Sequence, residues 1–255
     1  MSEFERAFAL MDAIDEAIAE RVEAVPHGDV VVDARLPRVH DRNFLRAKTP
    51  EGASAHALAD EAESVQRRYA EIRHRRVNLR DEAEIARLEP GFVELGWEPQ
   101  RFVVMAHRRD ADRPARHDVR EVDEPTLRAI WAEAIRHEPH GKDEVLVREI
   151  LAHHRGIGAS VPTRYFAAEA GGRIAAYCEL YSLAGTGQVE NVVTLPEFRW
   201  QGLARAVVLH AVGESRGEGN EPTFLVADAG DWPHKLYEKL GFDTVGRYAR
   251  YLRTL

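Results

Sequence analysis

The hydrophobic positions of this chain follow helical spacing in some segments and strand spacing in others, which predicts a mixed α/β protein. Near the start, apolar side chains recur every three or four residues and form one helix face: Phe4, Phe8, Met11, Ile14, Ile18 and Val22. We expect this helix to end at Pro26-His27-Gly28. The rest of the first half predicts strands at 30–32, 77–79 and 101–106 and helices at 53–70 and 82–95.

The second half predicts a longer alternation of both element types. Strands are expected near residue 119 and at 165–169, 174–180, 188–195, 223–227 and 247–252, and helices at 125–136, 142–154, 202–216 and 232–240. Gly171-Gly172 favours a tight hairpin between two of these strands. Residues 107–117 have no apolar periodicity and the composition of an exposed linker. We therefore predict two domains, residues 1–110 and 118–255.

Composition narrows the classes of function. The formal charge is -8, from 43 acids against 35 bases, so there is no electrostatic reason to expect a nucleic-acid partner. The short basic cluster Arg73-His74-Arg75-Arg76 is typical of a solvated turn or strand start. No apolar run approaches the roughly 20 residues that cross a bilayer, so we expect no membrane association. The first residues are acidic, unlike a signal peptide, and we expect a cytoplasmic protein.

The residues that commonly bind metals are poorly arranged for it here. Cys178 is the one cysteine, which rules out an internal disulfide and a multi-cysteine zinc site. We expect it to be a small buried strand residue. The histidine pairs His137/His140 and His153/His154 have no cysteine or nearby carboxylate at ligand spacing, so we predict no metal.

The most specific pattern joins a predicted strand to a predicted helix through Arg199-Trp200-Gln201-Gly202-Leu203-Ala204. A glycine lets the backbone approach a ligand closely, and the first amides of a helix have no partner inside it. Together with the helix dipole they form a binding place for an anion such as a pyrophosphate. A small residue at Ala204 leaves room for that approach. A dinucleotide site is disfavoured, because no Gly-x-Gly-x-x-Gly follows a first strand.

This segment resembles the acyl-CoA pyrophosphate loop of the GNAT superfamily of N-acyltransferases, whose signature is Gln or Arg, two residues, Gly, one residue, then Gly or Ala. Leu236-Tyr237-Glu238-Lys239-Leu240-Gly241-Phe242 resembles its second landmark, a helix ending in Gly-Phe. The order of predicted elements in 118–255 is also similar. The resemblance implies the GNAT fold, a mixed central β-sheet flanked by helices, and acetyl-CoA as co-substrate. The implied cofactor-binding residues are Val192, Val193, Thr194, Arg199, Trp200, Gln201, Gly202, Leu203, Ala204 and Arg205.

The resemblance also implies roles around the acyl group. Val192, Val193 and Thr194 would act through their main chain, because the superfamily strand diverges here from its neighbour; a plain central strand explains the same apolar run. Alternation predicts Glu190 on the face of Val192 and Thr194, as a general base with a raised pKa, or else as an exposed carboxylate at a strand end. Tyr237 would protonate the departing thiolate, or else be a core residue.

The chain departs from the superfamily in one place. Many relatives have an asparagine after the next strand, whereas this sequence has Asp228-Ala229-Gly230-Asp231. Either aspartate could replace that contact to pantetheine or could cap a turn.

The N-terminal half contains a segment similar to the second landmark. Leu95-Gly96-Trp97 follows a predicted helix and precedes a strand, as Leu240-Gly241-Phe242 does. We interpret it as a second, degenerate GNAT-like lobe in tandem; an unrelated α/β domain is the alternative. Residues 36–43 contain no glycine, so we expect this lobe to bind no cofactor.

The sequence therefore predicts an N-acetyltransferase that moves an acetyl group from acetyl-CoA directly to a primary amine of a small molecule. A protein or peptide N-acetyltransferase and a non-catalytic acyl-CoA-binding regulatory module are the alternatives. The acceptor is expected between the helices of 125–154, where Glu133, Glu138, Asp143 and Glu144 favour a cationic molecule. The protein is expected to be a monomer or a homodimer.

Overall fold

The chain forms two units, and each unit is built from three separate segments of the sequence. The structure, a computed structural model, describes residues 1–255. Unit 1 comprises Met1–Ile14, Val104–Ala227 and Asp231–Val245, and unit 2 comprises Asp15–Val103, Asp228–Gly230 and Gly246–Leu255. The predicted single boundary between residues 110 and 118 divides the chain differently, because α1 (Glu3–Ile18), β5 (Glu98–His107) and β11 (Phe242–Thr254) each contribute to both units.

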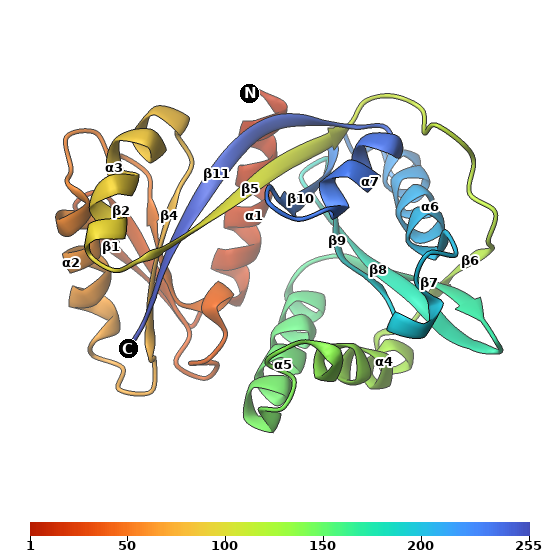
Figure 1. The fold of residues 1–255 in the computed structure, drawn as a ribbon, viewed down its shortest axis with the longest axis horizontal. Coiled ribbons are helices and arrows are strands. Elements are labelled where there is room, and N and C mark those ends of the chain that lie inside the picture. Colours follow the sequence, from red (N-terminus) through yellow and green to blue (C-terminus); the bar gives the residue numbers. More distant parts are fainter. The chain divides into compact units, whose positions relative to one another are not determined.

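Unit 1 contains a sheet with the strand order β10-β9-β8-β7-β6. The strands are β6 (Val119–Val122), β7 (Thr163–Ala170), β8 (Arg173–Leu183), β9 (Thr186–Thr194) and β10 (Thr223–Asp228). Neighbours are antiparallel except β9 and β10, which are parallel. Its helices are α4 (Glu124–His137), α5 (Glu144–Ser160), α6 (Leu203–Gly217) and α7 (Pro233–Lys239) (Figure 1).

The helices of unit 1 cover both faces of this sheet. Trp131 of α4 packs against Tyr165 and Tyr177 on one face. On the other face, Cys178 donates its thiol hydrogen to the carbonyl of Val207 in α6, at 3.4 Å. Gly171 and Gly172 have positive φ angles of 60° and 78° and join β7 to β8, so the predicted hairpin is confirmed.

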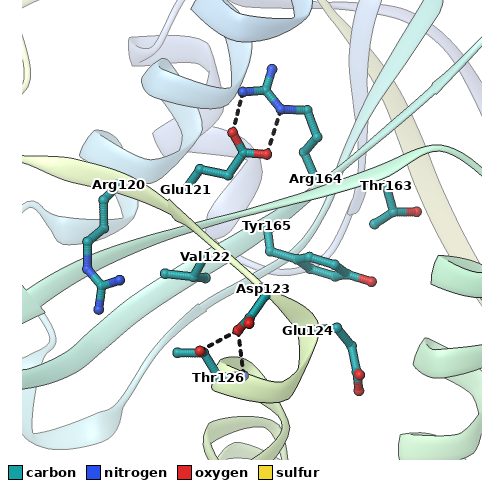
Figure 2. A pocket seen from close by; sticks show the side chains of 9 residues that line it. All are labelled: Arg120, Glu121, Val122, Asp123, Glu124, Thr126, Thr163, Arg164 and Tyr165. Carbon is teal, nitrogen blue, oxygen red and sulfur yellow. Dashed lines mark hydrogen bonds and ion pairs between the residues drawn. The ribbon is translucent and has the colours of Figure 1, made fainter.

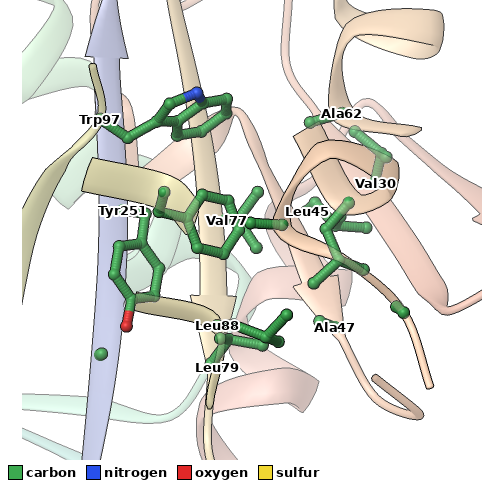
Figure 3. Close-up of a cluster of buried hydrophobic side chains, with 14 of the residues drawn as sticks. Val30, Leu45, Ala47, Ala62, Val77, Leu79, Leu88, Trp97 and Tyr251 are labelled. Carbon is green, nitrogen blue, oxygen red and sulfur yellow. The ribbon is translucent and has the colours of Figure 1, made fainter. Parts of the chain in front are cut away.

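Unit 2 has the strand order β1-β2-β3-β4-β11. Its strands are β1 (Arg21–Val25), β2 (Gly28–Val32), β3 (Phe44–Ala47), β4 (His74–Leu79) and the last residues of β11, and its helices are α2 (Ala55–Gln66) and α3 (Glu82–Glu94). Apolar side chains from these strands meet those of α2 and α3 in one buried cluster, in which Val77, Leu88 and Tyr251 lie together (Figure 3). Burial of such side chains is the main stabilising contribution to the unit.

The two units repeat one succession of elements. Two antiparallel pairings, β1/β2 and β2/β3, are followed by the parallel pairing of β3 with β4 across helix α2. Strands β7, β8, β9 and β10 and helix α6 follow the same succession. This shared topology supports the repetition that the sequence suggests.

The repeat extends to the helix that follows each parallel pair. Tyr237 meets Phe242 edge to face with ring centroids 6.1 Å apart at 62°, and Phe92 meets Trp97 at 5.5 Å and 62°. Gly96 and Gly241 end the two helices with positive φ angles of 77° and 96°, which favour glycine.

Several sequence predictions for unit 2 are wrong in instructive ways. Val22 lies in strand β1 rather than in the first helix, which ends at Ile18. Strand β3 was not predicted, because its four residues include the buried Arg46, which is paired with Asp29 and Glu16 at 2.7 and 2.8 Å. The segment 36–43, which contains no glycine, precedes β3 and does not link β3 to α2, so it is not the counterpart of the phosphate loop.

The basic cluster at the start of β4 is not solvated. His74, Arg75 and Arg76 are 2–3% exposed and lie inside the strand, so only the prediction of a strand start is confirmed. Arg75 pairs with Glu63, and Arg76 pairs with Asp41 at 2.7 Å. Buried cations require such partners because an unpaired charge in a protein interior is costly.

Candidate functional site

Strands β9 and β10 pair only where they begin. Thr223 lies opposite Gly187 and Phe224 opposite Gln188, and the Gly187 amide donates to the carbonyl of Pro222 at 3.0 Å. Beyond Gln188, β9 continues to Thr194 and β10 to Asp228 without further pairing between them. The backbone groups of β9 that face β10 are therefore available to a ligand, since unpaired amides seek acceptors.

The direction of these amides follows from one hydrogen bond. The Leu195 amide donates to the carbonyl of Ala175 in β8, at 2.9 Å. Because successive amides of a strand point to opposite sides, those of Val192 and Thr194 point toward β10 and that of Val193 toward β8. Val193 contributes its side chain to the apolar cluster around Trp131. Of the three predicted main-chain ligands, Val192 and Thr194 have the suitable direction.

Helix α6 begins directly after this opening, without a capping side chain. Gly202 has φ 88° and no side-chain hydrogen bond to the first turn. A Cβ atom at Gly202 would have only His117 Nε2 nearby, at 4.0 Å. Trp200 also has a positive φ, of 68°. The free amides at the start of the helix, together with the helix dipole, form an anion-binding geometry.

The loop before α6 is held by the segment that the sequence suggested as an exposed linker. His117 Nε2 lies 2.7 Å from the carbonyl oxygen of Gln201. Arg205 in α6 is 5% exposed, donates to the carbonyl of Arg113 at 2.9 Å and pairs with Asp112 at 2.7 Å. Its guanidinium therefore anchors this segment and does not point at the predicted phosphate position.

The side chains of the other loop residues are partly exposed and partly buried. Leu203 is 1% exposed, so only its amide can reach a ligand, whereas the Ala204 side chain is half-buried. Arg199, Trp200 and Gln201 are exposed. Arg199 Nε donates to the carbonyl of Thr194 at 3.4 Å, which places a cation beside the strand end.

A β-bulge changes the predicted face of Glu190. Tyr177 lies opposite Val193 but Glu179 lies opposite Glu190, so β9 contains one extra residue between these pairs. Asn191 occupies the bulge with φ 50°. Glu190 consequently shares a face with Glu179 and Val193, and not with Val192 and Thr194 as strict alternation predicts. Gln188 Nε2 donates to Glu190 Oε2 at 2.7 Å.

The bulge is fixed by a buried carboxylate that the sequence analysis did not identify. Glu179 is fully buried and accepts hydrogen bonds from Asn191 Nδ2 at 2.5 Å and from the Tyr181 hydroxyl at 2.6 Å. His154 Nδ1 of α5 lies 3.3 Å from it. Burial acts to raise the pKa of Glu179, but His154, Asn191 and Tyr181 together hold it below its usual value. The signal in the sequence that could have identified Glu179 is its position as an acid within the largely apolar run 174–183.

Tyr237 of α7 lies within electrostatic reach of Glu190. It is 8% exposed, and burial first, then the charges of Glu190 and Cys178, raise the pKa of its phenol. The hydroxyl is therefore protonated at neutral pH, as a hydrogen donor must be.

The sequence left open whether Asp228 and Asp231 contact pantetheine or cap a turn. In the structure they accept hydrogen bonds within a turn, from the amides of Gly230 and Trp232 respectively, each at 2.7 Å.

Unit 1 has two hollows, and Glu124 and Tyr165 line both of them. One, of about 610 Å³, is lined by charged side chains that bond to one another: Glu121 pairs with Arg164, and Asp123 accepts from the Thr126 amide at 3.0 Å (Figure 2). The other, of about 620 Å³, lies between α4 and α5 and includes Arg128, Arg155 and Tyr165. Burial, Glu179 and Glu124 raise the pKa of Tyr165 to about 12.

Cys178 is fully buried, as predicted, and burial raises the pKa of its thiol. A thiol in this state is a poor nucleophile. None of the helices combines the length and apolar character that crossing a bilayer requires.

Comparisons with known proteins agree with this geometry. Residues 124–242 match the model of the acetyltransferase (GNAT) family. No curated protein matches the sequence. A GCN5-related N-acetyltransferase from Kribbella flavida shares the fold over 98% of this chain and 95% of its own, with a TM-score of 0.66 and 17% identity.

Two further solved structures are similar across both units. A conserved protein of unknown function from Staphylococcus epidermidis has a TM-score of 0.69 at 14% identity, covering 92% of this chain and 94% of its own. A GCN5-related N-acetyltransferase from Sphaerobacter thermophilus has a TM-score of 0.61 at 17% identity, covering 89% of this chain and 76% of its own. The predicted fold is thus confirmed over nearly the whole chain. Residues 124–242 form the GNAT acetyltransferase domain that the sequence pattern predicts.

Proposed function

We propose that this protein is an N-acetyltransferase that transfers an acetyl group from acetyl-CoA directly to a primary amine of a small molecule. The observation that carries the proposal is the parting of β9 from β10 next to the uncapped start of α6. The α6 amides would bind the pyrophosphate, and pantetheine would follow the unpaired edge of β9. The Val192 and Thr194 amides would then stabilise the oxyanion that forms on the acyl carbonyl.

Glu190 is the proposed base of the transfer. The acceptor amine must lose a proton, which Glu190 takes directly or through a water molecule. The neutral amine then attacks the thioester carbonyl and forms a tetrahedral intermediate. As this intermediate collapses, the C–S bond breaks, the nitrogen gives up its second proton to the departing CoA thiolate or to water, and the amide is formed. The hydrogen bond from Gln188 Nε2 holds the Glu190 carboxylate in place.

Tyr237 is the proposed donor to the departing thiolate. Its raised pKa keeps the phenol protonated, so that a hydrogen is present when the negative charge develops on sulfur. The same raised pKa makes complete proton transfer less favourable, so we expect its main contribution to be a hydrogen bond that strengthens in the transition state.

Two features bear on the acceptor. Three of the acids that favoured a cationic molecule already have partners: Glu133 pairs with Arg173, Glu144 pairs with Arg136, and Asp143 caps α5. These acids therefore do not favour a cationic acceptor. The hollow of about 620 Å³ between α4 and α5 has the volume of a small-molecule pocket, but Glu190, Tyr237 and the residues of β9 are not among those that line it, so its size does not decide between a small acceptor and a peptide.

Release of free thiol from acetyl-CoA, measured with a panel of small amines and peptides, tests the proposal. Release that depends on a small primary amine supports it. Release with peptides alone would favour a peptide N-acetyltransferase. Binding of acetyl-CoA in calorimetry without release by any amine would favour a regulatory module.

A further inference from the structure

Two tryptophans expose their rings at the open end of the parted strands. Trp200 is 88% exposed and precedes α6, and Trp232 is 53% exposed and precedes α7. Their ring centroids lie 5.5 Å apart with an angle of 32°. The remaining tryptophans, Trp97 and Trp131, are buried. Each segment that leaves the opening between β9 and β10 thus carries one indole, and the two indoles meet.

The exposure of Trp200 is accompanied by an unfavourable backbone. Its φ of 68° lies in the left-handed region, which is uncommon for a bulky residue and costs of order 1 kcal/mol or more. The strained conformation places a large apolar ring in water, where it gains little from burial. Strain retained together with exposure is typical of a residue that contacts a ligand.

The surroundings of the pair favour a phosphorylated aromatic ligand over an apolar protein partner. Arg199 comes directly before Trp200 and Lys235 comes three residues after Trp232, and both are exposed cations. The uncapped start of α6 begins three residues after Trp200. A ligand whose pyrophosphate lies on the α6 amides carries its base one ribose away from them, and Trp200 comes three residues before those amides in the chain.

We propose that Trp200 and Trp232 form an aromatic platform on which the adenine ring of CoA stacks, with Arg199 and Lys235 close to its ribose phosphate. The proposal rests on the proposed function, because it requires the pyrophosphate at α6. Stacking of a base on an aromatic side chain is strong enough to affect affinity and tolerates a solvent-exposed position.

Calorimetry with CoA and with 4′-phosphopantetheine, which lacks the adenosine, tests the platform. We expect Trp232→Ala and Trp200→Gly each to weaken CoA binding roughly 5- to 100-fold. The affinity for 4′-phosphopantetheine should not change. Glycine is used at position 200 because it keeps the left-handed backbone while removing the ring. Trp232→Phe should retain most of the CoA affinity.

Tryptophan fluorescence gives a second readout. Adenosine 3′,5′-bisphosphate should quench part of the wild-type emission, and a variant carrying Trp200→Phe and Trp232→Phe should show none of that change, because Trp97 and Trp131 are buried. Unchanged CoA affinity in the alanine and glycine variants would overturn the platform. An equal loss for CoA and 4′-phosphopantetheine would also overturn it, since the rings would then only shape the loop. A wild-type protein that binds neither ligand would refute the proposed function and the platform together.

Discussion

The two parallel crossovers of this molecule share a topology and differ where a cofactor would bind. In unit 2, β3 and β4 pair at Leu45/Val77 and Arg46/Asn78, within one residue of the ends of both strands. In unit 1, β9 and β10 pair at Gly187 and Gln188 and then part. The pair in unit 2 is closed at its carboxyl end, and the pair in unit 1 is open.

The helices that follow the two loops also differ, because the start of α2 is capped and the start of α6 is not. The Ser54 hydroxyl caps α2 by accepting from the Ala57 amide at 3.1 Å, whereas Gly202 leaves the start of α6 uncapped. Arg87 also holds the unit 2 loop through the carbonyls of Pro50 and Ala53, at 3.0 and 2.7 Å.

The aromatic position of the following helix is Phe92 in unit 2, where unit 1 has Tyr237 with its hydroxyl. Strand pairing, caps and one hydroxyl, rather than topology, therefore distinguish the two units. We expect unit 2 to bind no acyl-CoA.

The largest effect is expected at Glu190. Replacing it by Gln removes the proposed base and should lower kcat/KM by roughly 10²- to 10⁴-fold with little change in acetyl-CoA affinity. Steady-state kinetics at several pH values measure this. Glu51→Gln, an exposed acid in the unit 2 loop, is the matched control and should behave as wild type. Near wild-type turnover of Glu190→Gln would remove the assignment.

Tyr237→Phe makes unit 1 resemble unit 2 at this position. We expect kcat to fall about 10-fold, because one hydrogen bond to the leaving thiolate is lost, and KM for acetyl-CoA to change little. The phenyl ring keeps the contact with Phe242, so thermal unfolding should be unaffected. If kcat stays the same, Tyr237 is only a packing residue.

Acid should weaken the closed strand pair of unit 2. Burial first, and then the charge of His40, lower the pKa of His74 from 6.5 to about 3. The unfolded chain therefore binds a proton that the folded chain does not, so stability falls as pH drops below about 6.5.

Between pH 7 and 5.5 this histidine should cost about 1.3 kcal/mol of unfolding free energy. Urea unfolding at both pH values measures it, and His74→Gln should flatten the dependence. An identical pH dependence in the variant would show that other groups cause the loss.

The smallest effect is expected at the cap of α2. Ser54→Ala removes the hydrogen bond to the Ala57 amide and should lower the unfolding free energy by roughly 0.5–1 kcal/mol without changing kcat/KM. Denaturant unfolding and the thiol-release assay measure the two quantities. A loss of activity at unchanged stability would mean that this loop contributes to the reaction.

The sequence predicted the features that depend on local pattern. The loop from Arg199 to Ala204, the helices of unit 1 and the Gly171-Gly172 hairpin follow from glycine positions and periodicity, and the elements match. The face of Glu190 did not follow, because the bulge at Asn191 depends on a bond to Glu179, twelve residues earlier in the chain. No periodicity encodes such a contact.

The partners of Arg205 and the strand that contains Arg46 do not follow from the sequence, for the same reason. Arg205 matches the position after a phosphate loop, yet its partners Asp112 and Arg113 come from a distant segment. Arg46 interrupts an apolar strand and is tolerated because Asp29 and Glu16 neutralise it. Charged side chains whose partners are distant in the sequence cannot be recognised from the residues next to them.

Calorimetry of acetyl-CoA binding to two glycine variants tests the central claim most directly. Gly202 and Gly52 lie in the two corresponding loops, both have positive φ, and neither has a neighbour closer than 4.0 Å to an added Cβ. Both substitutions by Glu therefore carry a similar backbone cost. We predict that Gly202→Glu abolishes acetyl-CoA binding, while Gly52→Glu binds as wild type. Equal affinity of the two variants would contradict the account.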